Sequence, residues 1–217
     1  MSLLSVSDLH VSFATEEGVV QAVDGVSFDI EAGEVVAIVG ESGSGKSVTA
    51  MTMLGLTRSP NARFEGSAIF DETELLTATE SELEGIRGNG IAMVFQDPMS
   101  SLDPVYRVGD QIVEQIRAHD PDLSRGAAYE RAVELLGKVG IPRPAERARS
   151  FPHEFSGGMR ERVMIAMSLS CSPELLIADE PTTALDVTIQ AQILRLLAEL
   201  RDELGICLLY TSDAADE

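Results

Sequence analysis

The sequence predicts an α/β protein with a parallel-sheet core, an N-terminal antiparallel β subdomain and an inserted helical subdomain. Three observations support this prediction: short runs that are apolar at almost every position, an N-terminal region where apolar and polar residues alternate, and a long amphipathic stretch between two apolar runs. Strands that are covered on both faces give near-continuous apolar runs, whereas half-buried strands alternate. A chain of 217 residues is long enough for one domain with a large core.

The antiparallel subdomain is expected first. Residues 3–13 (LLSVSDLHVSF), 19–30 (VVQAVDGVSFDI) and 63–70 (RFEGSAIF) alternate between apolar and polar positions. We expect turns at Gly18 and Gly25.

Four apolar runs predict the parallel core. They are VVAIVG (35–40), IAMVFQ (91–96), LLIADE (175–180) and ICLLY (206–210). Amphipathic helical patterns fill residues 105–149, and we expect a helical subdomain over about 100–160. Residues 187–204 have helical spacing, and Gly205 follows as a C-terminal cap.

The bulk composition excludes several classes of protein. A net charge of −20 without a basic stripe argues against a nucleic-acid partner, because phosphate binding needs clustered Lys and Arg. A solvated acidic surface is the preferred interpretation, and adaptation to a salty cytoplasm stays open. The apolar runs are shorter than the roughly 18 residues of a membrane span. We expect no secretion signal, and Cys171 and Cys207 are expected to be reduced core thiols.

Residues 40–47, GESGSGKS, have the spacing of a phosphate-binding loop between a strand and a helix. Backbone amides at Gly43 and Gly45 curl around phosphate oxygens, Lys46 reaches the β- and γ-phosphates, and Ser47 ligates Mg²⁺. The predicted nucleotide contacts are Gly40, Glu41, Ser42, Gly43, Ser44, Gly45, Lys46, Ser47 and Val48.

A second motif, ELLIADEP (174–181), ends a predicted strand with two carboxylates. Asp179 matches the carboxylate that holds Mg²⁺ in phosphate-loop nucleotidases, and Glu180 can accept a proton from the attacking water. An ordinary entry into a loop is the alternative interpretation.

A third motif, FSGGMRER (155–162), places two glycines at a helix start, although Gly costs about 1 kcal/mol relative to Ala within a helix. The glycines leave bare amides at a positively polarised helix start, which Ser156 can cap. In combination with the other two motifs, we interpret this as a second phosphate-binding device.

Together the three motifs resemble those of the ATP-binding-cassette (ABC) ATPases, and the resemblance covers residues 1–210. It implies a P-loop (RecA-like) core that binds ATP and Mg²⁺ and couples ATP hydrolysis to transport. It also implies a head-to-tail dimer, in which Ser156, Gly157 and Gly158 of one protomer contact the γ-phosphate held by the other.

The resemblance implies roles for three further residues. Phe13 is similar to the aromatic residue that stacks on adenine, with plain core packing as the alternative. Gln96 resembles the glutamine that contacts Mg²⁺ and senses the transport partner, with a solvated strand end as the alternative. Asp186 resembles the aspartate that couples the two sites across the dimer. The expected catalytic residues are Glu180, Gln96 and Lys46.

A narrower resemblance, to ATPase subunits of dipeptide, oligopeptide and nickel importers, rests on FQDPMSSLDP (95–104), residues 151–169 and residues 179–194. It implies a second ATPase protomer, membrane permease subunits and an extracytoplasmic solute-binding protein as partners. The protein is then expected at the cytoplasmic face of the membrane, held there by the permease. A soluble ABC ATPase acting in DNA repair or on ribosomes is the main alternative, and a small-molecule kinase is a third.

One departure concerns the last strand. The family places a γ-phosphate-contacting histidine after it, but the histidines here are His10, His119 and His153. Residues 211–217 are expected to be a non-native tail, with a natural chain that carries a degenerate switch as the alternative.

Overall fold

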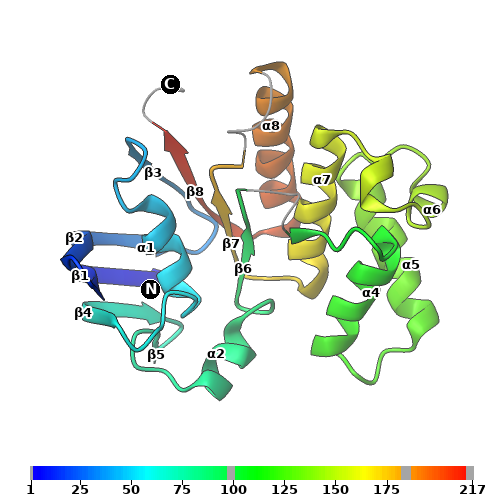
Figure 1. The fold of residues 1–217 in the computed structure, drawn as a ribbon. Helices are drawn as coiled ribbons and strands as arrows, with labels where there is room; N and C mark the ends of the chain where they lie inside the picture. Colours follow the sequence, from blue (N-terminus) through cyan, green and yellow to red (C-terminus); the bar gives the residue numbers. More distant parts are fainter. Residues whose placement is uncertain (1, 97–100, 182–186, 214–217) are drawn as a thin grey trace.

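The computed structural model describes residues 2–96, 101–181 and 187–213. It contains an antiparallel sheet of order β2-β1-β4-β5 and a parallel sheet of order β3-β8-β7-β6. The parallel sheet lies between the antiparallel sheet and the cluster of helices labelled α4, α5 and α6 in Figure 1. The predicted fold class, with a parallel core, an antiparallel subdomain and inserted helices, is confirmed.

The antiparallel sheet is built from the N-terminal region, as predicted. Its strands are β1 (Ser2–Thr15), β2 (Gly18–Glu31), β4 (Ala62–Phe70) and β5 (Thr73–Glu74). Gly18 begins β2 directly after the β1–β2 turn, as expected. The expected turn at Gly25 is wrong: Gly25 lies inside β2, where the pairing register shifts between Leu9 and His10 of β1. The isolated glycine marks a bulge and leaves the strand continuous.

The parallel sheet matches the four apolar runs. Its strands are β3 (Val35–Gly40), β6 (Ile91–Val94), β7 (Leu175–Asp179) and β8 (Cys207–Asp213). Successive residues of β7 alternate between two cores: Leu176 and Ala178 pack with the helices, and Leu175 and Ile177 pack with the antiparallel sheet. This period of two explains why the run is apolar throughout.

Strand β3 differs from the prediction of a strand covered on both faces. It lies at an edge of the parallel sheet, and Val35 and Val39 are exposed. The opposite edge of the strand pairs in parallel with β8, which continues through Asp213 and therefore beyond the predicted end at residue 210. The origin of residues 211–217 stays a prediction.

The helices follow the expected order along the chain. They are α1 (Lys46–Met53), α2 (Glu80–Ile86), α4 (Val108–His119), α5 (Arg125–Lys138), α6 (Pro144–Arg147), α7 (Gly157–Ser168) and α8 (Val187–Leu204), with short 3-10 turns at Pro152–Glu154 and Leu169–Cys171. Helix α8 has the predicted bounds. Among the described residues, no helix combines the length and the apolar character that crossing a membrane requires. Cys207 is buried in the core, whereas Cys171 is only half-buried.

Gly66 in β4 has a left-handed backbone, with φ of +92°, and an added Cβ would lie 2.2 Å from the Asp8 carbonyl oxygen. Substitution Gly66→Ala is therefore expected to destabilise the fold by about 2 kcal/mol or more. Chemical denaturation measures the loss of unfolding free energy. The matched control is Gly85→Ala on α2, where nothing lies near the added methyl group and the change is expected to be neutral or stabilising. Equal stability of the two variants would contradict the prediction.

Candidate functional site

The phosphate-binding loop leaves the end of β3 and enters α1, as the sequence predicts. Gly45 has φ of +93°, and a Cβ there would lie 2.2 Å from the Ala22 carbonyl oxygen, so the position requires glycine. The loop residues before Gly45 are exposed, whereas Lys46 is buried. Those exposed residues are Glu41, Ser42, Gly43 and Ser44.

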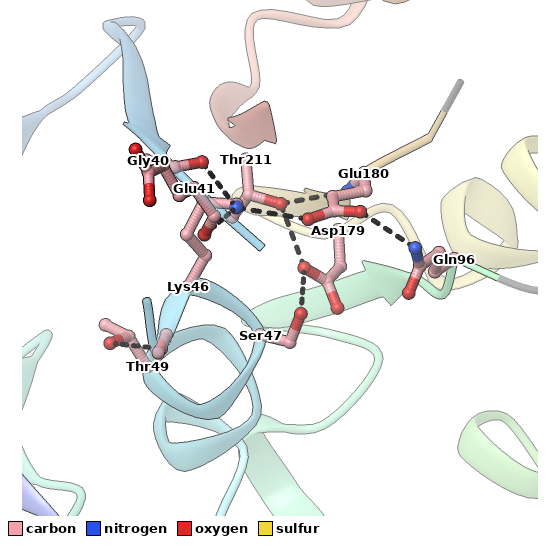
Figure 2. Close-up of polar contacts among 10 residues, drawn as sticks. Gly40, Glu41, Lys46, Ser47, Thr49, Gln96, Asp179, Glu180 and Thr211 are labelled. Carbon is pink, nitrogen blue, oxygen red and sulfur yellow. Dashed lines mark hydrogen bonds and ion pairs between the residues drawn. The ribbon is translucent and has the colours of Figure 1, made fainter. Parts of the chain in front are cut away.

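Lys46 carries a buried positive charge among oxygen atoms. Its Nζ donates to the carbonyl oxygens of Gly40 (2.7 Å) and Glu41 (3.1 Å). The same Nζ lies 3.2 Å from Glu180 Oε1, an ion pair that joins the phosphate loop to the end of β7. Figure 2 shows these contacts converging on the ammonium group.

Asp179 ends β7 and faces two hydroxyl groups. Ser47 Oγ donates to Asp179 Oδ1 at 3.0 Å, and Thr211 Oγ1 donates to the same oxygen at 2.9 Å. Burial raises the pKa of the Asp179 carboxyl, and the two hydrogen bonds act in the opposite direction. The structure thus brings Ser47 and Asp179, two of the three predicted Mg²⁺ ligands, into direct contact, whereas the third, Gln96, hydrogen-bonds to the neighbouring Glu180.

Glu180 has the unusual backbone of the site, with φ of +44°. Such a left-handed conformation of a non-glycine residue costs about 1–3 kcal/mol and persists where the surroundings enforce it. Gln96 Nε2 donates to Glu180 Oε2 at 2.8 Å, and the Glu180 amide donates to Thr211 Oγ1 at 2.9 Å. All three predicted catalytic residues (Glu180, Gln96 and Lys46) therefore share one cluster (Figure 2).

A cavity of about 240 Å³ opens beside Lys46. Its lining residues are Val20, Gln21, Ala22, Gly43, Gly45, Lys46, Ser47, Val48 and Glu180. Phe13 is not among them: it is half-buried and packs against the core beneath the antiparallel sheet. The stacking of Phe13 on adenine stays a prediction, as do the nucleotide contacts of residues 40–48.

The Ser-Gly-Gly segment begins α7, as predicted, but does not line this cavity. Ser156 occupies the N-cap position with extended backbone, yet its side chain makes no capping hydrogen bond, so the expected cap is wrong. An added Cβ at Gly158 would lie 2.9 Å from Ile189 Cγ2, so close packing against α8 is one reason for glycine there. Asp186 lies outside the described residues.

Two buried polar residues, Thr211 and Glu161, are not indicated by any motif of the sequence. Thr211 gives no signal in the sequence because its partners, Asp179 and Glu180, are more than thirty residues away. Glu161 lies in α7 and is 2% exposed, and its Oε1 has no hydrogen-bond partner among the residues that the structure describes. Burial raises the pKa of Glu161 to about 8, so this carboxyl is largely protonated at neutral pH.

A family model described as "ABC transporter" matches residues 23–183, which is most of the chain and includes the phosphate loop, the Ser-Gly-Gly segment and both carboxylates. The chain belongs to the ABC transporter family. Its relatives within the family include the oligopeptide transport ATP-binding protein OppD of Bacillus subtilis, which is 53% identical over 96% of this chain and 58% of the relative. The dipeptide transport ATP-binding protein DppD of the same organism is 51% identical over 97% of this chain and 63% of the relative.

This chain spans about three-fifths of the length of these curated relatives. Its fold is similar to that of solved ATP-binding cassettes. A dimeric cassette in a post-hydrolysis state bound to ADP and phosphate superposes with a TM-score of 0.84 at 28% identity, over 96% of this chain and 87% of that chain. A cassette from Clostridium perfringens, part of an ABC transporter complex, has a TM-score of 0.77 at 28% identity, over 98% of this chain and 78% of that chain.

The raised pKa of Glu161 predicts a pH-dependent stability. Because the folded state binds this proton more tightly than the unfolded state, stability falls as pH rises from about 4.5 to about 8. Each pH unit in that window costs up to about 1.4 kcal/mol. The variant Glu161→Gln, which cannot ionise, is therefore expected to be more stable than the unsubstituted chain at pH 8.5 and nearly equal to it at pH 5.

Urea unfolding at the two pH values measures this difference, and the exposed Glu84→Gln on α2 is the control. A gain for Glu161→Gln that is the same at both pH values would contradict the prediction.

Proposed function

We propose that this chain is the ATP-binding and ATP-hydrolysing region of a subunit that powers an ABC importer for peptides. The observation that carries the proposal is the convergence of Lys46, Ser47, Asp179 and Glu180 at one edge of the parallel sheet. The peptide class is supported by the relatives, whose names describe oligopeptide and dipeptide transport.

Nucleotide binding rests on positive charge at the start of α1. The loop amides and the N-terminus of α1 offer hydrogen-bond donors and a partial positive charge to phosphate oxygens. Lys46 supplies a full charge at the same place, lining the cavity together with Ser47. The acidic neighbours Asp179 and Glu180 repel phosphates, so Lys46 and the loop amides supply the attraction.

The donor set at Asp179 fits Mg²⁺. This ion prefers oxygen ligands and is held in nucleotide sites by one or two carboxylates plus substrate phosphates. Asp179 and Ser47 offer a carboxylate oxygen and a hydroxyl oxygen that contact each other. Gln96, the third predicted ligand, donates a hydrogen bond to the neighbouring Glu180. When bound, Mg²⁺ neutralises charge on the phosphates and draws off charge that develops on transfer.

Glu180 acts as general base in this proposal. The water oxygen bonds to the γ-phosphorus, its proton passes to the Glu180 carboxylate, and ADP leaves with the electrons of the broken P–O bond. Here the Glu180 carboxylate is engaged by Lys46 on one oxygen and by Gln96 on the other. Phosphate oxygens compete for Lys46, so nucleotide binding releases Oε1 from the ion pair.

The proposal includes three partners. A second ATPase protomer supplies Ser156 and Gly157 to the γ-phosphate, which is consistent with the fact that neither residue lines the cavity within one chain. A membrane permease docks near Gln96 and the helical subdomain, where Val105 and Tyr106 are exposed beside a groove of about 650 Å³. An extracytoplasmic solute-binding protein delivers the peptide. These partners place the protein peripherally on the cytoplasmic face of the membrane.

The variant Glu180→Gln tests the chemistry. It keeps the shape and hydrogen-bonding capacity of the side chain but cannot accept a proton, so phosphate release from Mg-ATP is expected to fall about 10²- to 10⁴-fold while ATP binding persists. The contrasting variant Lys46→Ala is expected to lose most ATP binding, because it removes the charge facing the phosphates. Phosphate-release assays and calorimetry measure the two effects. Unchanged nucleotide affinity in Lys46→Ala would refute the proposed site.

The variant Gly157→Asp tests the dimer. An added carboxylate at the start of α7 would face the partner's γ-phosphate, so ATP-driven dimerisation is expected to fail while ATP binding to the single chain persists. Light scattering with and without ATP measures dimerisation. The matched control is Gly126→Asp, which puts the same carboxylate in the exposed first turn of α5. Normal ATP-dependent dimers of Gly157→Asp would contradict the prediction.

A further inference from the structure

Thr211 is a buried hydroxyl residue near the end of β8, and it touches both carboxylate residues of the site. Its side chain is 1% exposed. Its Oγ1 accepts a hydrogen bond from the Glu180 amide at 2.9 Å and donates one to Asp179 Oδ1 at 2.9 Å. A hydroxyl has one donor hydrogen and two acceptor lone pairs, so one oxygen can make both bonds.

The parallel register explains why this residue reaches the site. β8 pairs with β7 on one side and β3 on the other, and Thr211 stands opposite Asp179 and Ile38. It therefore lies between the strand that leads into the phosphate loop and the strand that ends in the carboxylates. Figure 2 shows two dashed lines from the Thr211 hydroxyl, one to the Asp179 carboxylate and one to the Glu180 backbone nitrogen.

The Glu180 backbone needs such a partner. The β7–β8 pairing ends at Asp179, and Glu180 then turns into the left-handed region with φ of +44°. A buried amide without an acceptor is costly, and Thr211 Oγ1 supplies the acceptor at the residue where the ladder stops. The Glu180 side chain leaves this turn toward Lys46 and Gln96.

We propose that Thr211 is a positioning residue for Glu180: its hydroxyl holds the left-handed turn after β7, and that turn aims the Glu180 carboxylate at the cavity beside Lys46. This role rests on the proposed function, in which Glu180 is the general base, and on the alternative in which residues 211–217 belong to the natural chain. Thr211 itself touches neither nucleotide nor water in this role, and it acts through the Glu180 amide.

Hydrogen exchange of the Glu180 amide tests the contact directly. Thr211→Val keeps the shape but removes the hydroxyl, and Thr211→Ser keeps the hydroxyl. In the full chain, exchange at Glu180 is expected to accelerate at least several-fold in Thr211→Val and to stay close to the unsubstituted rate in Thr211→Ser. Buried amides elsewhere in β7 report whether the fold is intact. Equal protection of the Glu180 amide in all three chains overturns the proposal.

Steady-state hydrolysis of Mg-ATP tests the consequence. Thr211→Val is expected to lower kcat about 10- to 100-fold, since a slightly misplaced catalytic group can cost about 10²-fold. KM should change by less than about twofold, because the phosphate contacts remain. Thr211→Ser is expected to recover most of kcat. A merely structural role would instead lower the folded fraction and leave the kcat of the folded chain unchanged.

A double-mutant cycle with Glu180→Gln completes the test. If Thr211 acts through the Glu180 carboxylate, adding Thr211→Val to Glu180→Gln lowers the residual rate no further. Additive losses overturn the positioning role. An unsubstituted chain that releases no phosphate overturns the proposed function, a result that the exchange measurement distinguishes from failure of the Thr211 contact.

Discussion

The hydrogen bond from Ser47 to Asp179 joins two segments that are 132 residues apart in the chain, and the rest of the site depends on it. It exists because β3 and β7 run parallel in one sheet, with β8 between them, and their carboxyl ends reach the same edge. The phosphate loop follows β3, and the carboxylates end β7. Any change that shifts these strands would separate the phosphate loop from the two carboxylates, the residues for which we propose nucleotide, metal and proton-accepting roles.

The sheet keeps this alignment because both faces of β6, β7 and β8 are packed. Alternate residues of β7 enter two different cores, one under the helices and one under the antiparallel sheet. Burial on both faces fixes the register strongly, since a shift of one residue would exchange the two cores. The antiparallel subdomain also reaches the site directly, because Ala22 crowds Gly45 in the phosphate loop.

Three carboxyl groups that are fully or mostly buried, those of Asp179, Glu180 and Glu161, differ in their hydrogen-bond and ion-pair partners. Asp179 receives two hydroxyl donors, and Glu180 is paired with Lys46 and Gln96. Among the described residues, Glu161 Oε1 has no hydrogen-bond partner, and burial raises the pKa of Glu161 to about 8. Asp179 and Glu180 lie in the candidate site, whereas ionisation of the Glu161 carboxyl is predicted to lower the stability of the fold as pH rises.

The sequence by itself determined the fold class, the bounds of α8 and the phosphate loop, because periodicity and glycine spacing are local properties. It also marked Asp179 and Glu180, which follow a recognisable apolar run. Tertiary structure alone decided that β3 is an exposed edge strand, that Gly25 is a bulge, and that Thr211 contacts both carboxylates. These features depend on which strands become neighbours and in what register. Neither the neighbours of a strand nor their register can be predicted from a short stretch of residues, because strand pairing joins segments far apart in the chain.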